Sequence, residues 1–190
     1  MYRMSIITLL APPALAGKLD LNRCMKMCLI HDMAESLVGD ITPDDNVPKK
    51  VKSKREEDTM DFITKNLLGD VYGGGAGAEL KAIWKEYEDS ETLESRFVHD
   101  VDKMELLLQM FEYEKRSGGE IDLSEFLSVR KGVKLREVNE WADQLMADRE
   151  AFWEEVGREK GVACNAKNMA AYVDWKKKLE EEAAKGSGGD

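Results

Sequence analysis

Apolar residues recur along the chain at spacings of three and four, and the alternation typical of β-strands is almost absent. The pattern predicts helices over residues 2–10, 21–37, 50–68, 92–115 and 135–156, a shorter helix carrying Leu80, Ile83, Trp84 and Tyr87, and a helical turn over 123–127. A polar stretch at 41–49 and a glycine-rich stretch at 70–78 predict loops. We therefore expect an all-α fold, a bundle of about six helices.

The predicted helix over 21–37 carries the most informative group of side chains. Cys28, His31, Asp32 and Glu35 stand at positions i, i+3, i+4 and i+7, which share one helix face. Three ionisable groups on an apolar helix are costly to bury unless something neutralises them. A divalent metal would do so, because imidazole and carboxylate are its ligands. The alternative is a solvated helix end in which His31 pairs with Glu35.

The predicted helix over 92–115 offers two further acids. Asp100 has basic residues within one turn, so we expect it on a solvated face. Asp102 has apolar residues four positions to either side, so it is expected against apolar surroundings, where a carboxylate needs a partner. Asp102 is therefore the better metal candidate. His99, close to Lys103, is expected to face water.

Charge and composition exclude several classes of function. Among 190 residues, 38 are acidic and 28 basic, and the net charge of −10 argues against a nucleic-acid polymer as partner. Three cysteines without a CxxC pair argue against a disulfide framework and a cysteine-based zinc site, and fit an intracellular protein. No apolar run is long enough to span a membrane.

The two ends of the chain need separate interpretation. The first segment, MYRMSIITLLAPPALAG, has features of a signal peptide, but it also fits a core helix over 2–10 that ends at Pro12 and Pro13. We expect one domain over 1–157. A charged extension should follow over 158–190, and its GSGGD end should be disordered.

Several motifs in fixed order resemble one family over about residues 1–155. They are MYRM, HDMAESLVGDITP, KREED, WKEYE and FVHDVDKMELLLQ. Together they are similar to the HD-domain metal-dependent phosphohydrolases, in particular the 5′-deoxynucleotidase branch. The resemblance implies an HD-domain helical bundle. It also favours the core-helix interpretation of residues 2–10, because MYRMSIITLL matches a core helix of that family.

The resemblance implies a divalent metal such as Mn²⁺ or Co²⁺, with His31, Asp32 and Asp102 as three of its four protein ligands. The family's first histidine precedes the MYRM segment and has no counterpart in the sequence given, so we expect an HD domain without its first helix. Three ligands should hold the metal more weakly than four, and activity in this form should be impaired.

The resemblance also implies two catalytic acids. Glu35 would orient or deprotonate the attacking water, and Asp40 would contact the sugar hydroxyl or the leaving oxygen. The alternative for Asp40 is a turn residue after Gly39. Lys52 and Arg55 match a segment that could meet the phosphate, although a solvated charged face is the favoured interpretation. Glu56 and Glu57 are interpreted in the same way.

The implied activity is hydrolysis of deoxyribonucleoside 5′-monophosphates to deoxynucleoside and phosphate. The partner would be a small-molecule nucleotide, with no nucleic-acid polymer and no membrane, and the family resemblance favours a homodimer. Two alternatives stay open. In the first alternative, the chain is an inactive helical scaffold or dimerisation module. In the second, it is an HD-type hydrolase of another phosphate ester or a signalling nucleotide.

Overall fold

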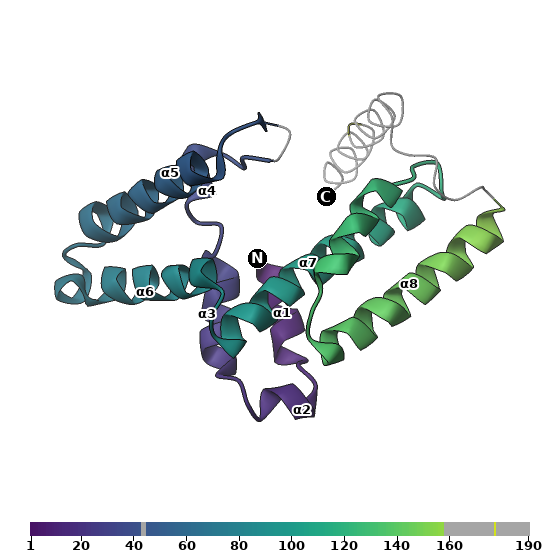
Figure 1. The fold of residues 1–190 in the computed structure, drawn as a ribbon, viewed down its shortest axis with the longest axis horizontal. Helices are drawn as coiled ribbons and strands as arrows, with labels where there is room; N and C mark the ends of the chain where they lie inside the picture. Colours follow the sequence, from purple (N-terminus) through teal and green to yellow (C-terminus); the bar gives the residue numbers. More distant parts are fainter. Residues whose placement is uncertain (43–44, 158–176, 178–190) are drawn as a thin grey trace, which may run out of the picture. The chain divides into compact units, whose positions relative to one another are not determined.

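A computed structural model describes residues 1–42, 45–157 and 177 of the chain (Figure 1). These residues form helices and connecting turns and contain no β-strand, which confirms the predicted all-α class. The elements are α1 (Tyr2–Leu9), α2 (Pro13–Ala16), α3 (Leu21–Ile30), α4 (Glu35–Val38), α5 (Lys49–Asp61), the π-helical η2 (Phe62–Leu67), the 3₁₀ elements η3 (Val71–Gly74) and η4 (Ser124–Gly132), α6 (Gly75–Asp89), α7 (Leu93–Arg116) and α8 (Arg136–Val156).

The chain divides into two compact units. The first is Met1–Asp102, and the second begins at Lys103, so α7 contributes to both. The predicted charged extension over 158–190, with its disordered end, lies outside the described residues apart from Lys177. No helix among the described residues is long and apolar enough to cross a membrane.

The predicted helix over 21–37 is wrong in its second half. Helix α3 ends at Ile30, residues 31–34 form a turn, and α4 is separate. The chain tightens there: the Met33 amide donates to the Ile30 carbonyl and the Glu35 amide to the Asp32 carbonyl, each at 3.0 Å. Such i→i−3 bonds commonly close a helix end. No glycine or proline marks this break, so the sequence pattern did not reveal it.

The predicted glycine-rich loop over 70–78 is also too long, because α6 already begins at Gly75. The reason is close packing between α6 and η2. A Cβ atom at Gly77 would lie 2.2 Å from the Thr64 carbonyl oxygen, so only glycine permits this approach. Glycine therefore serves as a contact residue of a helix here and does not mark a loop.

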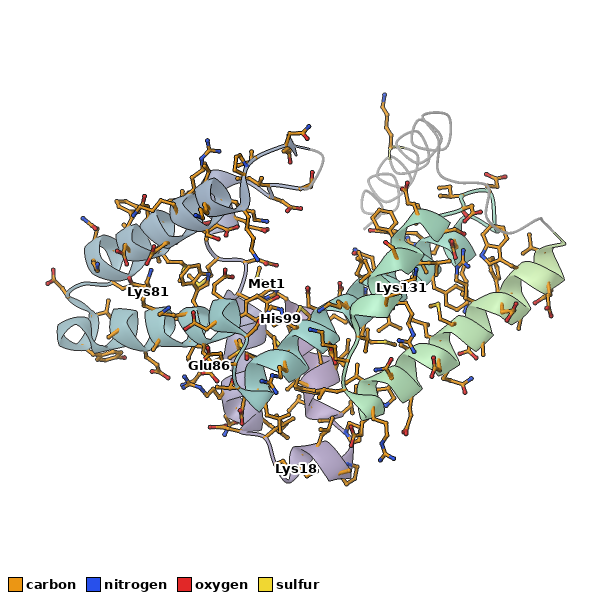
Figure 2. All side chains as sticks on the ribbon, in the orientation of Figure 1. Met1, Lys18, Lys81, Glu86, His99 and Lys131 are labelled. Atoms are coloured by element: carbon orange, nitrogen blue, oxygen red, sulfur yellow. The ribbon has the colours of Figure 1, made fainter. Side chains whose placement is uncertain are left out.

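In the first unit, α1 packs against α3, and α3 packs against α6. The α1–α3 interface is buried around Met4, Thr8 and Cys28, where Thr8 Oγ1 and Cys28 Sγ lie 3.4 Å apart. On the other side of α3, Arg23 Nε donates to Glu86 Oε2 of α6 at 2.5 Å; Figure 2 labels Glu86. Helix α3 is thereby fixed on two sides, and its C-terminal end at Ile30–His31 is fixed with it.

Helices α5 and α6 run side by side in Figure 1 and enclose a small core of Ala34, Met60, Ile63 and Trp84. Lys81 of α6, labelled in Figure 2, places Nζ 3.0 Å from Asp61 Oδ1 of α5 and donates to the Glu57 carbonyl at 3.2 Å. Since Ala34 belongs to the turn after α3, this core also holds that turn against α5 and α6.

The second unit is organised around a buried ion pair. Arg149 of α8 donates to both carboxylate oxygens of Glu114 of α7, at 2.7 and 2.8 Å. The indole of Trp153 and the amide of Leu123 donate to the same carboxylate, at 3.2 and 2.9 Å. Buried charges of this kind are stable when every polar atom has a partner.

Candidate metal and hydrolase site

His31 lies at the C-terminal end of α3 and is only 4% exposed. Its Nδ1–H donates to the Cys28 carbonyl at 3.1 Å, which turns Nε2 toward two carboxylates. Nε2 is 2.9 Å from Asp32 Oδ2 and 3.7 Å from Asp102 Oδ1. Asp102 therefore approaches the His31–Asp32 pair, as a shared ion would require. The alternative pairing of His31 with Glu35 is wrong, because Asp32 takes that place.

The predicted burial of the two acids on α7 is wrong. Asp100, expected in solvent, is 2% exposed, whereas the side chain of Asp102 is 45% exposed. The buried face of α7 is wider here than a single stripe, since Phe97, Val98 and Val101 are all fully buried. The neighbours of Asp100 and Asp102 along the helix therefore gave the wrong exposure for both side chains, although Asp102 still reaches His31.

The two carboxylates determine the charge of His31. Burial acts to lower the pKa of its imidazole, but the hydrogen bonds and negative charges of Asp102 and Asp32 outweigh burial and raise the pKa to about 9. Burial likewise opposes ionisation of Asp32, yet its bond to His31 leaves the pKa of that carboxyl below its usual value. The cluster is therefore a site for one positive charge, held by one imidazole and two carboxylates.

The donor types fit a divalent metal. A histidine that binds a metal through Nε2 usually donates its Nδ1–H to a carbonyl or carboxylate oxygen, as His31 does to the Cys28 carbonyl. Metal–ligand bonds of about 2 Å bring ligand atoms to roughly 3–4 Å from each other. The side chains are nevertheless arranged around a shared proton. Within residues 1–42, 45–157 and 177, no group of three His, Cys, Asp or Glu side chains surrounds one cation position. Binding would require Asp32 and Asp102 to turn from the imidazole toward the ion.

A cavity of about 300 Å³ opens beside His31. The turn after α3, helix α5 and helix α6 supply its lining, which is His31, Asp32, Ala34, Glu35, Lys49, Lys52, Ser53, Glu56, Tyr87 and Glu88. Four carboxylates thus face two lysines and a histidine. An anionic ligand would meet net repulsion in this cavity unless it arrived with a cation.

Glu35 lines this cavity although the helix that was expected to place it is broken. Partial burial raises the pKa of its carboxyl, the charges of Asp32 and Asp40 add to the rise, and the pKa reaches about 7. A carboxyl with that pKa can take up and release a proton near neutral pH.

Asp40 is exposed and is not part of the cavity lining. It follows Gly39, whose φ of +78° ends α4 in a conformation that favours glycine. Both interpretations of Asp40 keep support from this position. It is a residue of the turn, and its charge still acts on Glu35.

The solvated face predicted for Lys52 and Glu56 is wrong, because both line the cavity and Glu56 is only 9% exposed. Arg55 and Glu57 are exposed, as expected. A signal was present in the sequence: Lys52, Glu56 and the buried Met60 are spaced four apart, so they share a face that leads into the core.

Tyr87 is a site residue that the sequence placed only on a short predicted helix. Its ring lies between the two histidines of the chain, with centroid distances of 4.9 Å to His31 and 3.9 Å to His99. His99, labelled in Figure 2, was expected to face water but is half-buried. Its Nε2 lies 3.0 Å from the Tyr87 carbonyl oxygen and 2.5 Å from Ser90 Oγ, which fixes the ring against Tyr87.

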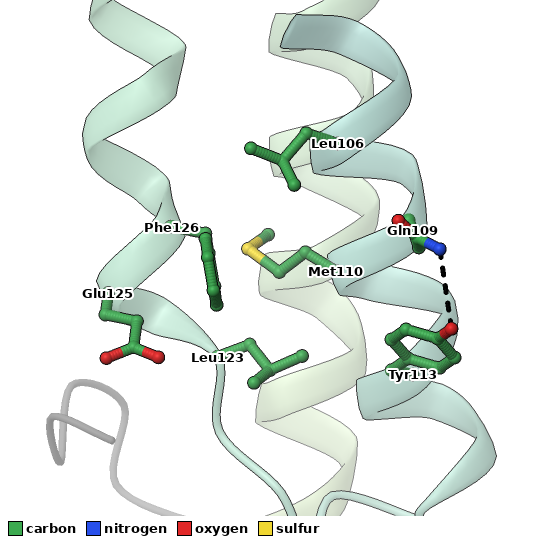
Figure 3. A pocket seen from close by; sticks show the side chains of 7 residues that line it. All are labelled: Leu106, Gln109, Met110, Tyr113, Leu123, Glu125 and Phe126. Carbon is green, nitrogen blue, oxygen red and sulfur yellow. Dashed lines mark hydrogen bonds between the residues drawn. The ribbon is translucent and has the colours of Figure 1, made fainter. Parts of the chain in front are cut away.

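The second unit has a smaller, mostly apolar cavity (Figure 3). Its lining is Leu106, Gln109, Met110, Tyr113, Leu123, Glu125 and Phe126. Glu125 is the one charged side chain in that lining, and no histidine accompanies it. This chemistry does not suit a phosphate ester or a metal, so the site beside His31 is the candidate.

A helical first unit with a His-Asp pair and a distant aspartate at its centre is the arrangement of an HD domain, and residues 1–141 match the HD domain family. The chain belongs to this family and lies among proteins named 5′-deoxynucleotidases. It is 41% identical over 160 residues to 5′-deoxynucleotidase hdd1 of Schizosaccharomyces pombe, covering 84% of this chain and 79% of that protein.

Two further relatives support the same placement. Identity to 5′-deoxynucleotidase YGK1 of Saccharomyces cerevisiae is 40%, over 81% of this chain and 70% of the relative. Identity to 5′-deoxynucleotidase HDDC2 of Bos taurus is 36%, over 80% and 70%. A solved structure of the HD domain-containing protein YGK1 superposes with a TM-score of 0.62 at 33% identity, covering 80% of this chain and 74% of that one.

Proposed function

We propose that this protein hydrolyses deoxyribonucleoside 5′-monophosphates to deoxynucleoside and inorganic phosphate, with a divalent metal. The observation that carries the proposal is the His31–Asp32–Asp102 cluster at a cavity that also contains Glu35. In a family whose relatives are named 5′-deoxynucleotidases, this cluster combines ligands for one cation with a carboxyl suited to proton transfer.

His31, Asp32 and Asp102 would hold the metal, with Mn²⁺ or Co²⁺ as the expected ions. When bound, such an ion polarises the phosphoryl group and lowers the pKa of a coordinated water. The chain's own part is to fix the ligands. The Cys28 carbonyl holds the His31 ring through Nδ1, and Tyr87 packs against that ring.

Glu35 would accept the proton of the attacking water, because burial and neighbouring acids keep the pKa of its carboxyl at about 7. Water adds to phosphorus, the bond to the 5′-oxygen breaks, and that oxygen must gain a proton as it leaves. Asp40, at the edge of the site, would contact the sugar hydroxyl or this leaving oxygen. Lys52 and Lys49 offset part of the cavity's negative charge.

A comparison of substrates separates this function from the two alternatives. Full-length protein with Mn²⁺ or Co²⁺ should release phosphate from deoxyribonucleoside 5′-monophosphates faster than from ribonucleotides, a simple aryl phosphate or a cyclic dinucleotide. Faster turnover of one of the other compounds would favour an HD-type hydrolase of a different ester or a signalling nucleotide. Absence of turnover with every compound, in protein that melts cooperatively, would favour the inactive scaffold.

We also propose that the protein acts inside the cell on a small nucleotide. Cys24 and Cys28 are free, buried thiols, which supports an intracellular location, and the acidic balance supports a small nucleotide rather than a nucleic-acid polymer as partner. The homodimer stays a prediction.

A further inference from the structure

Lys52 contacts the backbone of Ile41, the side chain of Glu56 and the cavity beside His31. Its Nζ donates to the Ile41 carbonyl at 2.9 Å, it lies 3.7 Å from Glu56 Oε1, and its side chain lines the cavity beside His31. Glu56 is nearly buried, so the ammonium group is held on one side by a fixed carboxylate. On the other side the ammonium group donates to the backbone carbonyl of Ile41, the residue immediately after Asp40.

Among the described residues, the segment that carries Asp40 has few other anchors. Gly39 leaves α4 at a φ of +78°, and Asp40 is exposed. Further along, the amide of Thr42 donates to Asp45 Oδ2 at 2.7 Å, and its hydroxyl donates to the same oxygen at 2.9 Å. These bonds close a local turn but do not connect it to a helix. The Lys52 bond ties residue 41 to α5.

Lys54 shows what a lysine on the same helix does without this role. It pairs with Asp58, also four residues ahead, at 2.6 Å, but both side chains are more than half exposed. An exposed i, i+4 pair of this kind contributes little to stability. Lys52 and Lys54 are therefore a matched set, because both are lysines of α5 with an acid four residues ahead. Of the two, only Lys52 lines the cavity beside His31 and bonds the Asp40 segment.

We propose that Lys52 is a positioning residue: anchored by Glu56, it holds the Ile41 carbonyl and thereby fixes Asp40 at the edge of the cavity. The inference rests on the proposed function, in which Asp40 contacts the sugar hydroxyl or the leaving oxygen. Lys52 acts through Asp40: without the bond to the Ile41 carbonyl, Asp40 would shift. A shift of about 1 Å in a catalytic group can cost up to about 100-fold in rate.

The test is a double-mutant cycle on the full chain, measured as phosphate release from a deoxyribonucleoside 5′-monophosphate. Lys52→Met should lower kcat about 10- to 100-fold with little change in KM, and Lys52→Arg should restore most of it. Lys54→Met should match wild type. In an Asp40→Asn background, Lys52→Met should cause no further loss. A further loss there, or a rise in KM alone, would overturn the proposal and show that Lys52 meets the substrate directly.

Hydrogen exchange supplies a readout that does not depend on turnover. In Lys52→Met, backbone amides of residues 40–42 should exchange faster than in wild type, with an unchanged melting temperature, whereas Lys54→Met and Asp40→Asn should leave them unchanged. Unaltered exchange in Lys52→Met would refute the positioning role. If wild type releases no phosphate while exchange behaves as expected, the proposed function fails and the Lys52 tether stands.

Discussion

At the scale of single residues, the site depends on one buried imidazole placed between two carboxylates. His31 is held through Nδ1 by the Cys28 carbonyl, and Nε2 faces Asp32 and Asp102 at 2.9 and 3.7 Å. Glu35 lies in the same cavity but makes no ion pair with His31 in the described part of the chain. We therefore propose that His31, Asp32 and Asp102 are metal ligands and that Glu35 carries the proton, and this division can be tested.

Replacing Glu35 should separate the two roles. Glu35→Ala should leave Mn²⁺ affinity and the melting temperature nearly unchanged and should lower kcat by about 10²–10⁴-fold, the usual effect of removing a positioned acid–base group. His31→Ala and Asp32→Ala should lose the metal itself, as measured by calorimetric titration with Mn²⁺. If Glu35→Ala loses the metal as readily as Asp32→Ala, Glu35 is a ligand and its assigned role is wrong.

The thiol of Cys24 should be unreactive in the folded protein. Burial is the main cause that raises its pKa to about 12, and the charge of Glu94 adds to the shift, so almost no thiolate forms at pH 8. Alkylation by iodoacetamide, mapped to the peptide that contains Cys24, should occur only after denaturation. Rapid labelling of Cys24 in native protein at pH 8 would contradict its burial in the first unit.

The residues of the site were predictable in type, but their exposure was not. The His-Asp pair and the later aspartate could be found from the sequence, and Asp102 does approach His31. Asp100, Lys52 and Glu56 were misjudged because charged neighbours on the same helix suggested solvent, whereas burial depends on what other helices bring to that face. Tyr87 was predicted only as part of a short helix, and its contact with His31 depends on the packing of α3 and α6.

At the scale of elements, strong periodicity located the long helices, and the errors fall at short breaks. Helix α3 ends at Ile30 without glycine or proline, because a run of i→i−3 bonds turns the chain toward the core formed with α5 and α6. Helix α6 starts inside a glycine-rich segment because Gly77 faces the backbone of Thr64. In both cases tertiary packing decided the boundary.

Two glycines of α6 offer a paired test of this packing. Gly77→Ala would place a Cβ atom 2.2 Å from the Thr64 carbonyl oxygen, so α6 and η2 must separate, at an expected cost of about 1–3 kcal/mol. Gly75→Ala, which meets nothing within 4 Å and already has helical backbone angles, should be neutral or stabilise by about 0.4–1 kcal/mol. Urea unfolding measures both. Equal stability of the two variants would show that α6 does not approach η2 this closely.

At the scale of the whole molecule, the candidate site belongs entirely to the first unit, Met1–Asp102. The second unit has a different internal organisation, centred on Glu114 and Arg149. The single domain expected over 1–157 stays a prediction, because length and composition do not show how contacts divide a helical chain.

Stability of the second unit should depend on its buried ion pair. Glu114→Ala leaves the Arg149 guanidinium buried without its main partner, which should cost about 3–5 kcal/mol of unfolding free energy. Asp143→Ala removes a partner of Arg130 that is 71% exposed and should cost at most about 1 kcal/mol. Thermal denaturation followed by circular dichroism distinguishes them, and a comparable effect of both substitutions would contradict the central place of Glu114.

We propose that His31, Asp32 and Asp102 share one divalent cation that hydrolysis requires. The most direct measurement is phosphate release from a deoxyribonucleoside 5′-monophosphate as a function of Mn²⁺ concentration, for wild type and Asp102→Asn. Wild-type activity should rise to saturation with Mn²⁺ and vanish with EDTA, and Asp102→Asn should need at least about ten times more Mn²⁺. Identical Mn²⁺ curves for the two proteins, or activity that survives EDTA, would contradict the account.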